Sequence, residues 1–478
     1  MNSAFWTVVR TSSMALVAAL SVTGCASVDL RAGFSEVSAT VEERAGATVA
    51  WNQGIELDRE AAEKVQVLLR RRLTADDAVQ IALLNNRELQ ALYAELGVAQ
   101  ADLVQAGLFR NPILDVAVLL PLSGVRPDLQ LTMVFSLLDA LYVPLRKRVG
   151  AAAFEEAKLQ VAGTVLDFAA RVRATFHVHQ ADQQALELRQ TIVAALTASL
   201  DVSRRLHEAG NITDLDLART RAETEAAKLA LRSAEVAARQ SREDLNELMG
   251  VWGDETRWVL DARLPEIPAE NPAPPNDTER LALARSIDLA HARQRIVVAG
   301  QQLGYDRASA LAQTLEFGVE AEREEGWKVG PVLSVPIPLF DQGQARVGRA
   351  AAGFRRAQNE YYAMAVRIRA AARAIQERIR GSQDRALYYR DIVLPLQERI
   401  VNEAQLQYNA MQIGIFQLLR DRERQVEIGV QYVEALRDYW LARADLTQLS
   451  SGRLPRMSSA RMLGSGERMR IRGAPNGD

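Results

Sequence analysis

The stretch "TLEFGVEAE", residues 314–322, alternates polar and apolar side chains along its whole length. Every second side chain of a β-strand lies on the same face, so this period predicts a strand with one apolar and one polar face. "LQLTMVFSL" at 129–137 has the same period, interrupted only at Val134. Two further stretches, "ILDVAVLL" at 113–120 and "VGPVLSVPIPLF" at 329–340, are also predicted strands. The sequence therefore predicts four strands, in two pairs.

These strands leave two architectures open. A small soluble sheet would have one solvated face, whereas strands of a membrane barrel would turn apolar residues toward lipid and polar residues toward a lumen. The alternation does not separate the two, because the signal of a single barrel strand is weak. In a barrel, Asp115, Glu316 and Glu320 are the candidates for lining the lumen.

Very long helices are predicted after each pair of strands. Residues 151–208 and 343–409 are rich in good helix formers, and Pro395 is the only proline within them. At 1.5 Å per residue, such helices would be roughly 80–100 Å long. A short break follows each one, "EAGNITDLDL" at 208–217 and "NAMQIGIFQL" at 409–418, and precedes a return helix. Two long antiparallel helical hairpins are therefore expected.

The chain is a duplication with an offset of about 200 residues. "NNRELQALYAELGVAQADL" at 85–103 matches "RSIDLAHARQRIVVAGQQL" at 285–303, with Leu89 on Leu289 and Leu103 on Leu303. Each copy should open with one helix, near 75–107 and near 277–311. "LPEIPAENPAPPNDTER" separates the copies, and its prolines favour an extended linker.

These features divide the chain into six segments. They are a signal peptide (1–24), an N-terminal anchor and extended segment (25–72), repeat one (73–263), the Pro-rich linker (264–280), repeat two (281–452) and an Arg-rich tail expected to be disordered (453–478).

Composition excludes several classes of function. Lysine plus arginine total 58 and aspartate plus glutamate 60, so the formal charge of -2 offers no global attraction for nucleic acid. The single cysteine excludes an intramolecular disulfide and a cysteine-based zinc site. Neither a phosphate-binding glycine loop nor a nucleophile motif is found, so no catalysis and no cofactor are expected. His177 and His179 point about 200 degrees apart on a helix and could not share one metal ion, so no metal site is predicted.

The single cysteine, Cys25, follows Arg10, an apolar run at 14–20 and a series of small residues. This order is typical of a secretory signal, and the apolar run is too short to span a membrane. "VTGC" at 22–25 resembles the signal of bacterial lipoproteins, which implies a lipid anchor at Cys25. Alanine rather than aspartate at position 26 implies, by the same resemblance, delivery to the outer membrane.

The doubled helix-strand-strand-helix-helix unit resembles the TolC family of outer-membrane efflux channels over about residues 73–452. The motifs that carry the resemblance are "LTADDAVQIALLNNRELQA" at 73–91, "HEAGNITDLDLARTRAE" at 207–223 and "GPVLSVPIPLFDQGQARVG" at 330–348. It implies a mainly α-helical chain that forms a homotrimer, with four strands per chain in one membrane β-barrel and a periplasmic tunnel of helices. It also implies a passive exit duct for small molecules or metal ions, coupled to a periplasmic adaptor and an inner-membrane pump.

The resemblance also suggests where function resides. The channel would be gated at the hairpin tips, by Asp214 and Asp216 or by Arg420, Asp421 and Arg422, although Asp214 could instead cap the returning helix. The adaptor would contact the turn residues Gly210, Asn211, Ile212, Gln412, Ile413 and Gly414. Two other classes stay open: a periplasmic adaptor, which usually has one hairpin beside β-rich segments, and a structural coiled-coil lipoprotein, which would not need four strands.

Overall fold

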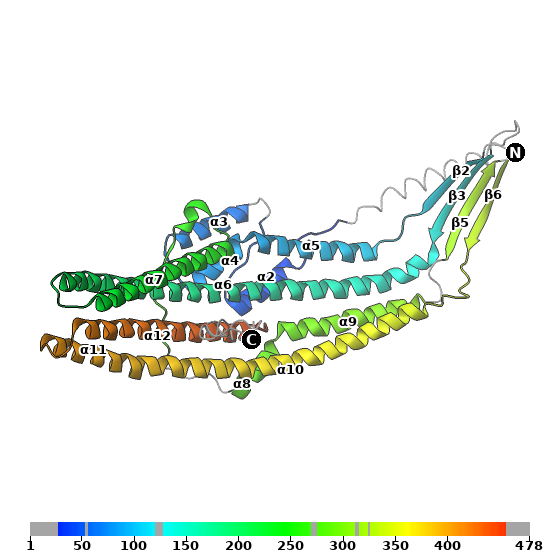
Figure 1. The fold of residues 1–478 in the computed structure, drawn as a ribbon. Helices are drawn as coiled ribbons and strands as arrows, with labels where there is room; N and C mark the ends of the chain where they lie inside the picture. The colour runs from blue at the N-terminus through cyan, green and yellow to red at the C-terminus, as the bar shows by residue number, and fades with distance from the viewer. Residues whose placement is uncertain are drawn as a thin grey trace, which may run out of the picture. The chain divides into compact units, whose positions relative to one another are not determined.

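The computed structural model describes residues 27–52, 56–119, 128–268, 275–310, 315–323 and 326–455 (Figure 1). The predicted signal peptide and Cys25 lie outside these residues. Two compact units are formed, each from three parts of the chain. Unit 1 contains the described residues within 27–35, 94–158 and 294–357, and unit 2 contains those within 36–93, 159–293 and 358–455.

Unit 1 contains the four predicted strands. They are β2 (Ile113–Leu119), β3 (Asp128–Ser136), β5 (Glu316–Arg323) and β6 (Trp327–Ser334), and all neighbours are antiparallel in the order β2-β3-β5-β6 (Figure 1). The central β3–β5 pair joins the two repeats. The last strand ends at Ser334 rather than at residue 340 as expected, because Pro336 and Pro338 have no N–H to donate to a ladder.

The two repeats differ where the second strand of each pair meets the long helix. In repeat one, α6 (Leu137–Glu208) begins directly after β3, earlier than the predicted start at 151, and contains Pro144 in its first turns. In repeat two, an irregular segment precedes α10 (Gln344–Tyr388) and ends at Gly343, whose φ is +76°. A Cβ at Gly343 would lie 2.9 Å from the Cα atom of Ala310. The glycine that repeat one lacks is therefore what allows this tight turn in repeat two.

The helix expected at the start of each repeat is two helices. The first repeat has α4 (Ala75–Asn85) and α5 (Arg87–Gly107), and the second has α8 (Pro275–Arg285) and α9 (Ile287–Ala308). The breaks fall at Asn86 and Ser286. Asn86 accepts a hydrogen bond from the backbone N–H of Glu88 at 2.8 Å, and Ser286 accepts one from that of Leu289 at 3.0 Å. Both residues thus cap the next helix, a role for which short polar side chains compete with helix continuation.

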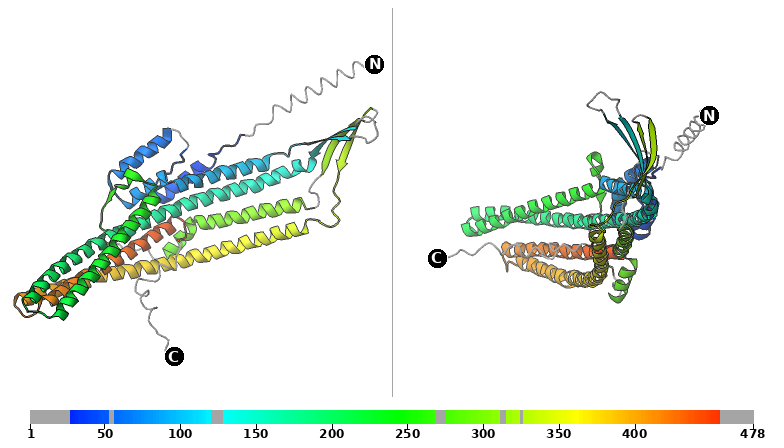
Figure 2. Two further views of the ribbon diagram at one scale, coloured as in Figure 1. Left: turned by 45° about the horizontal axis from the view of Figure 1, so that its top comes forward. Right: turned by 90° about the vertical axis from the view of Figure 1, so that its right-hand side faces the viewer.

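Unit 2 contains most of the two helical hairpins, from residues 159 and 358 onward, and these parts lie side by side in Figure 2. The return helices, α7 (Asp214–Met249) and α12 (Ile415–Ser450), have 36 residues each. Repeat two departs from a continuous first helix, because a π-helical turn, η2 (Tyr389–Val393), separates α10 from α11 (Leu394–Asn409). The π turn ends two residues before Pro395, which lies in the first turn of α11, where its missing N–H costs little.

The N-terminal segment is more helical than expected. Residues 25–72, predicted to be extended, contain α2 (Phe34–Ala45) and α3 (Glu56–Leu69). A two-stranded parallel sheet that the sequence did not predict joins β1 (Arg72–Leu73) to β4 (Val259–Leu260), which follows a short 3-10 helix, η1 (Gly253–Thr256).

Both boundaries around repeat two differ from the expectation. In the predicted linker, Leu264 is buried and donates its N–H to Gln184, and α8 already begins at Pro275. The predicted tail starts at Arg453, yet this half-buried side chain lies between Asp167 of α6 and Asp288 of α9 and bonds to both. Residues 456–478 of the tail lie outside the described residues.

The cores of unit 2 are made by the hairpin helices. One contains Ile368, Ile375 and Ile379 of α10 with Tyr439 and Leu449 of α12. Within the part of the chain that the structure describes, no helix is both long enough and apolar enough to cross a membrane.

Candidate functional site

The pairing register places the three predicted lumen residues on one face of the sheet. Asp115 lies opposite Thr132, and Thr132 lies opposite Glu320. Directly paired residues share a face, so the side chains of Asp115, Thr132 and Glu320 form one row across β2, β3 and β5. Glu316 lies on the same face two rows away, opposite Ser136 and Ser334. Gln130 donates a hydrogen bond to Glu320 across the β3–β5 pair. Asp128 of β3, opposite Leu119, lies on this face too, so the polar face has acidic residues on three strands.

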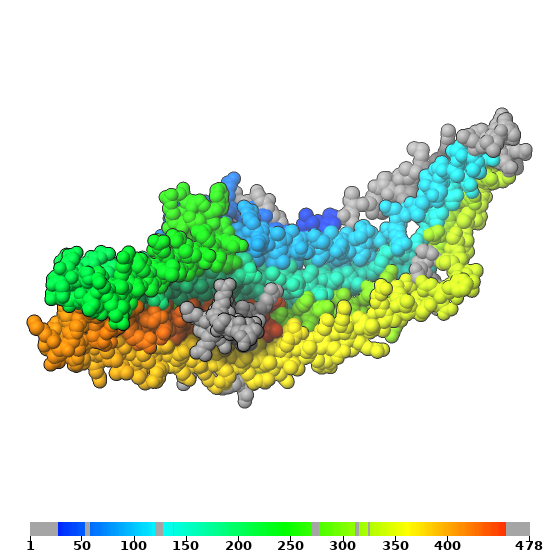
Figure 3. Space-filling model, viewed as in Figure 1, coloured from blue at the N-terminus to red at the C-terminus, as the bar shows by residue number. Residues whose placement is uncertain are grey.

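The opposite face of the sheet is apolar except for Arg323, which ends β5 opposite Leu129 and Trp327. Its register rows contain Leu114, Val116, Val118, Met133, Phe135, Phe317, Val319, Trp327, Val329 and Leu333. These side chains are between 40% and 69% exposed, and the sheet lies at the surface in Figure 3. A continuous apolar face of this kind is rare on soluble monomers and marks a surface that contacts lipid or protein.

The sheet has two open edges. Among the described residues, β2 pairs only with β3, and β6 pairs only with β5. Each edge strand therefore has a row of N–H and C=O groups that a single copy of this chain does not satisfy within its sheet.

The two hairpin turns have the same backbone geometry, although their sequences differ. Gly210 (φ +73°) donates to the carbonyl of His207, and Met411 (φ +59°) donates to the carbonyl of Tyr408. The following residue in each turn donates five residues back, which completes the Schellman arrangement at a helix end. Met411 therefore occupies the left-handed conformation that glycine takes in repeat one, with 94% of its surface exposed.

The remaining predicted contact residues flank these turns. Asn211, Gln412 and Gly414 are exposed, whereas Ile212 and Ile413 are half-buried. Gly414 precedes α12 without a side-chain cap.

Asp214 and Asp216 have different environments at the first tip. Thr213, not Asp214, caps α7: its Oγ1 accepts from the N–H of Asp216, and the Asp216 carboxylate accepts from Thr213 in return. These hydrogen bonds hold the pKa of Asp216 below its usual value. The Asp214 side chain is 97% exposed and lies 2.7 Å from Nε2 of His207.

The three candidates of the second tip lie in the second turn of α12. Arg420 donates to Gln417 at 2.9 Å, Asp421 accepts from Gln417 at 3.2 Å, and Arg422 donates to Gln425. The described residues show no ion pair for any of these three side chains, nor a bond that joins them to Asp214 or Asp216. All five charges at the tips are thus held by local bonds.

A cavity of about 360 Å³ lies between the hairpins, beside the second tip. Its walls include Ile192 and Leu196 of α6 and Leu418 and Glu423 of α12. Burial, with the nearby carboxylates of Glu223 and Glu427, raises the pKa of Glu423. Close by, Arg189 of α6 pairs with Glu427 at 2.7 Å. Sequence reasoning missed this cavity, because it depends on how two distant helices pack.

His177 and His179 are packed residues in different environments. His177 bonds to Gln180, while His179 is 1% exposed and bonds to Ser241 at 2.9 Å. Desolvation lowers the pKa of His179 to about 4, with the charge of Arg242 as a second cause. The residues that the structure describes contain no group of His, Cys, Asp or Glu side chains able to hold a metal ion.

Known proteins share this architecture. The chain is 22% identical over 383 residues to the cobalt-zinc-cadmium resistance protein CzcC of Cupriavidus metallidurans. The aligned region covers 79% of this chain and 90% of CzcC. The outer-membrane channel OprN has a TM-score of 0.63 at 16% identity, over 84% of this chain and 94% of OprN. The outer-membrane channel CmeC of Campylobacter jejuni has a TM-score of 0.63 at 13% identity, over 87% of this chain and 93% of CmeC. No family model matches the sequence.

Proposed function

We propose that this chain is the passive exit duct of a tripartite efflux pump. The chain has the fold of the TolC-family outer-membrane channels, as the sequence predicted. The two-faced sheet carries the proposal. Its apolar face is exposed, its polar face is acidic, and both of its edges are open. Lipid cannot satisfy open edges, so the sheet can cross a membrane only if copies of the chain close it into a barrel.

Three copies would close the barrel with twelve strands, with the apolar face toward lipid and the polar face toward the lumen. Asp115, Glu316 and Glu320 would then line the lumen, and three-fold symmetry would turn each into a ring of charge. The resemblance between the two hairpins supports a tunnel in which both repeats occupy equivalent positions.

The hairpin tips are the proposed contacts of the periplasmic adaptor, which joins the duct to an inner-membrane pump. Gly210, Asn211, Ile212, Gln412, Ile413 and Gly414 form these turns, and the matched backbone geometry offers the adaptor two similar surfaces per chain. Gating is proposed at Asp214 and Asp216, or at Arg420, Asp421 and Arg422. The hydrogen bonds of Asp216, Asp421 and Arg420 lie within a single helical turn. The tips of neighbouring copies could therefore move apart without unfolding a helix.

We propose divalent metal ions as the exported substrate, with other small molecules as the second candidate. The relative CzcC is named for resistance to cobalt, zinc and cadmium. The polar face of the sheet carries Asp115, Asp128, Glu316, Glu320 and Glu322 against Lys328, and acidic rings favour cations.

A deletion strain separates these substrates. Loss of the gene should increase sensitivity to cobalt, zinc or cadmium salts, and the wild-type gene should restore growth. Sensitivity only to dyes or antibiotics would replace metals by the second candidate. Recovery of the protein as a soluble monomer, rather than a trimer extracted from outer membranes, would contradict the duct itself.

The lipid anchor at Cys25 is proposed as an auxiliary tether, because the strands would already hold the protein in the membrane. Cys25→Ser should abolish labelling with radioactive palmitate and impair maturation, whereas exported protein should still form trimers. Failure of an exported, unlipidated form to assemble would show that the lipid is essential.

A further inference from the structure

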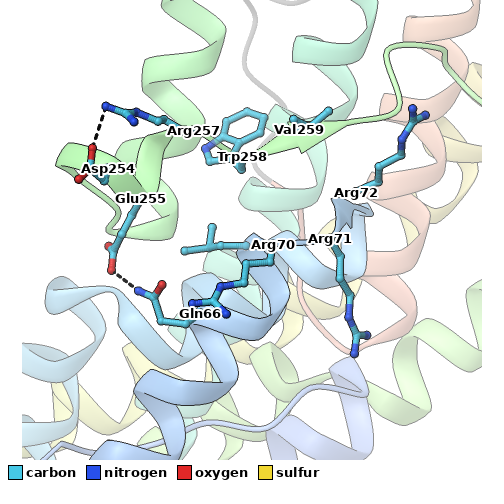
Figure 4. Close-up of a pocket in the computed structure, with 10 residues that line it drawn as sticks. Gln66, Arg70, Arg71, Arg72, Asp254, Glu255, Arg257, Trp258 and Val259 are labelled. Carbon is cyan, nitrogen blue, oxygen red and sulfur yellow. Dashed lines mark hydrogen bonds and ion pairs between the residues drawn. The ribbon is translucent and has the colours of Figure 1, made fainter.

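A pocket of about 600 Å³ in unit 2 is lined by four arginines: Arg70, Arg71, Arg72 and Arg257 (Figure 4). We call it the arginine pocket. The first three follow the end of α3, and the fourth follows η1. The pocket involves neither the four-stranded sheet nor the hairpin tips, so the export duct proposed above assigns it no role.

The backbone beneath these arginines is held firmly. Arg72 pairs with Val259 in the β1–β4 ladder, and the next residue, Leu73, is buried. On the other wall Trp258 is 2% exposed and donates its Nε1–H to Asn246 at 2.7 Å. The guanidinium of Arg242 lies 3.9 Å from the centroid of the Trp258 ring. The arginine side chains thus project from a rigid base, which reduces the entropy lost when a ligand binds.

The charges of the pocket do not balance. Two carboxylates line it against four guanidinium groups. Asp254 pairs with Arg257 at 2.9 Å, and Glu255 accepts a hydrogen bond from Gln66 at 2.6 Å. Arg70, Arg71 and Arg72 are exposed, and in the described part of the chain their side chains make no hydrogen bond or ion pair. Three guanidinium groups are therefore available to an anionic ligand.

The directions of these side chains define the shape of that ligand. In Figure 4, Arg71 and Arg72 extend in opposite directions from the backbone. They cannot grip one compact anion together, but they can each bind a separate carboxylate along an extended chain. Leu69 and Val259 add apolar surface beside the charges, and the side chain of Val259 is exposed. The ligand thus carries spaced carboxylates and at least one aliphatic side chain.

From this geometry we propose that the arginine pocket docks an extended, acidic peptide segment of a protein partner. Charge complementarity would speed the encounter and set its specificity. The proposal does not depend on export, because a peptide can bind whether or not the duct conducts.

The test measures binding of a fluorescein-labelled peptide, Glu-Glu-Leu-Glu-Glu, to the detergent-purified full chain by fluorescence anisotropy. The variant R70Q/R71Q/R72Q removes three positive charges from exposed positions. A matched control, R59Q/R232Q/R239Q, removes three charges from exposed positions that do not line the pocket. Circular dichroism and gel filtration serve to check that both variants fold like the wild type.

We expect the pocket variant to raise the Kd by about tenfold or more and to weaken its dependence on salt, with less than about a twofold change in the control. An equal loss of peptide affinity in the pocket variant and the control would overturn the proposal, because binding would then depend only on the net charge of the protein. Stronger binding of inorganic polyphosphate at equal charge would assign the pocket to a phosphate polymer and overturn the peptide. If the pocket variant still exports normally while peptide binding is lost, the two proposals are separated.

Discussion

At the scale of single residues, the burial of His179 makes the protein sensitive to acid. The folded state holds the pKa of His179 at about 4, whereas an unfolded chain has the ordinary value of 6.5. Between these values the unfolded state binds more protons, so stability falls as the pH falls.

Lowering the pH from 7 to 5 should therefore cost about 2 kcal/mol through His179. His179→Asn removes the titration and retains a group that can bond to Ser241. Urea unfolding of wild type and variant at both pH values tests this. The same acid loss in both proteins would show that other groups are responsible.

The two hairpin turns offer a second residue-scale test. Met411 adopts a positive φ at the position where repeat one has Gly210. A left-handed conformation costs an L-residue about 1 kcal/mol, and the exposed side chain of Met411 offers little packing in return.

Met411→Gly should therefore raise the Tm, and Gly210→Met should lower it by a similar amount. Differential scanning calorimetry of the detergent-purified protein compares the two. A Tm that falls for Met411→Gly would mean that the methionine makes a contact in the assembled protein which one chain does not show.

At the scale of elements, periodicity predicted the long helices and the four strands better than the residues at which they begin and end. The alternation at 314–322 predicted a strand, and the paired faces follow from the register. The breaks at Asn86 and Ser286 were missed, because the apolar period continues through both and only a local cap interrupts the helix. The ion pairs of Arg453 were also missed, since they join three segments that are far apart in sequence.

Adjacent residues on β5 provide an element-scale test of the two faces. Val319 lies on the apolar face, and Glu320 lies on the polar one. In a lipid-facing strand, Val319→Arg should cost about 2–4 kcal/mol near the middle of the bilayer and reduce the amount of trimer in outer membranes.

Glu320→Arg is the matched control and should assemble normally while lowering cation selectivity in planar bilayers. Heat-modifiable trimers on gels provide the first readout, and reversal potentials the second. If both variants assembled equally well, the apolar face would not be in contact with lipid.

At the scale of the whole molecule, the duplication accounts for most of what the sequence could predict. Two copies of one unit give two similar hairpins and one sheet, in which each repeat supplies a pair of strands. The arginine pocket and the cavity between the hairpins were not predictable in this way. Each is lined by segments from distant parts of the chain, and no periodic pattern encodes such a meeting.

The central claim is that the open edges β2 and β6 pair between copies and close a trimer. Ala117→Cys in β2 can be combined with Lys328→Cys, Gly330→Cys or Val332→Cys in β6. These three positions of β6 lie on the same face of the sheet as Ala117. Neighbouring strands place facing residues within the distance that a disulfide needs. Ala117→Cys alone is the control and should give no cross-link.

Non-reducing gels of oxidised outer membranes report the result. At least one of the three double variants should give a ladder of covalent species that ends at three copies. Monomer alone in all three variants, or a ladder that continues beyond three copies, would contradict a closed trimeric barrel.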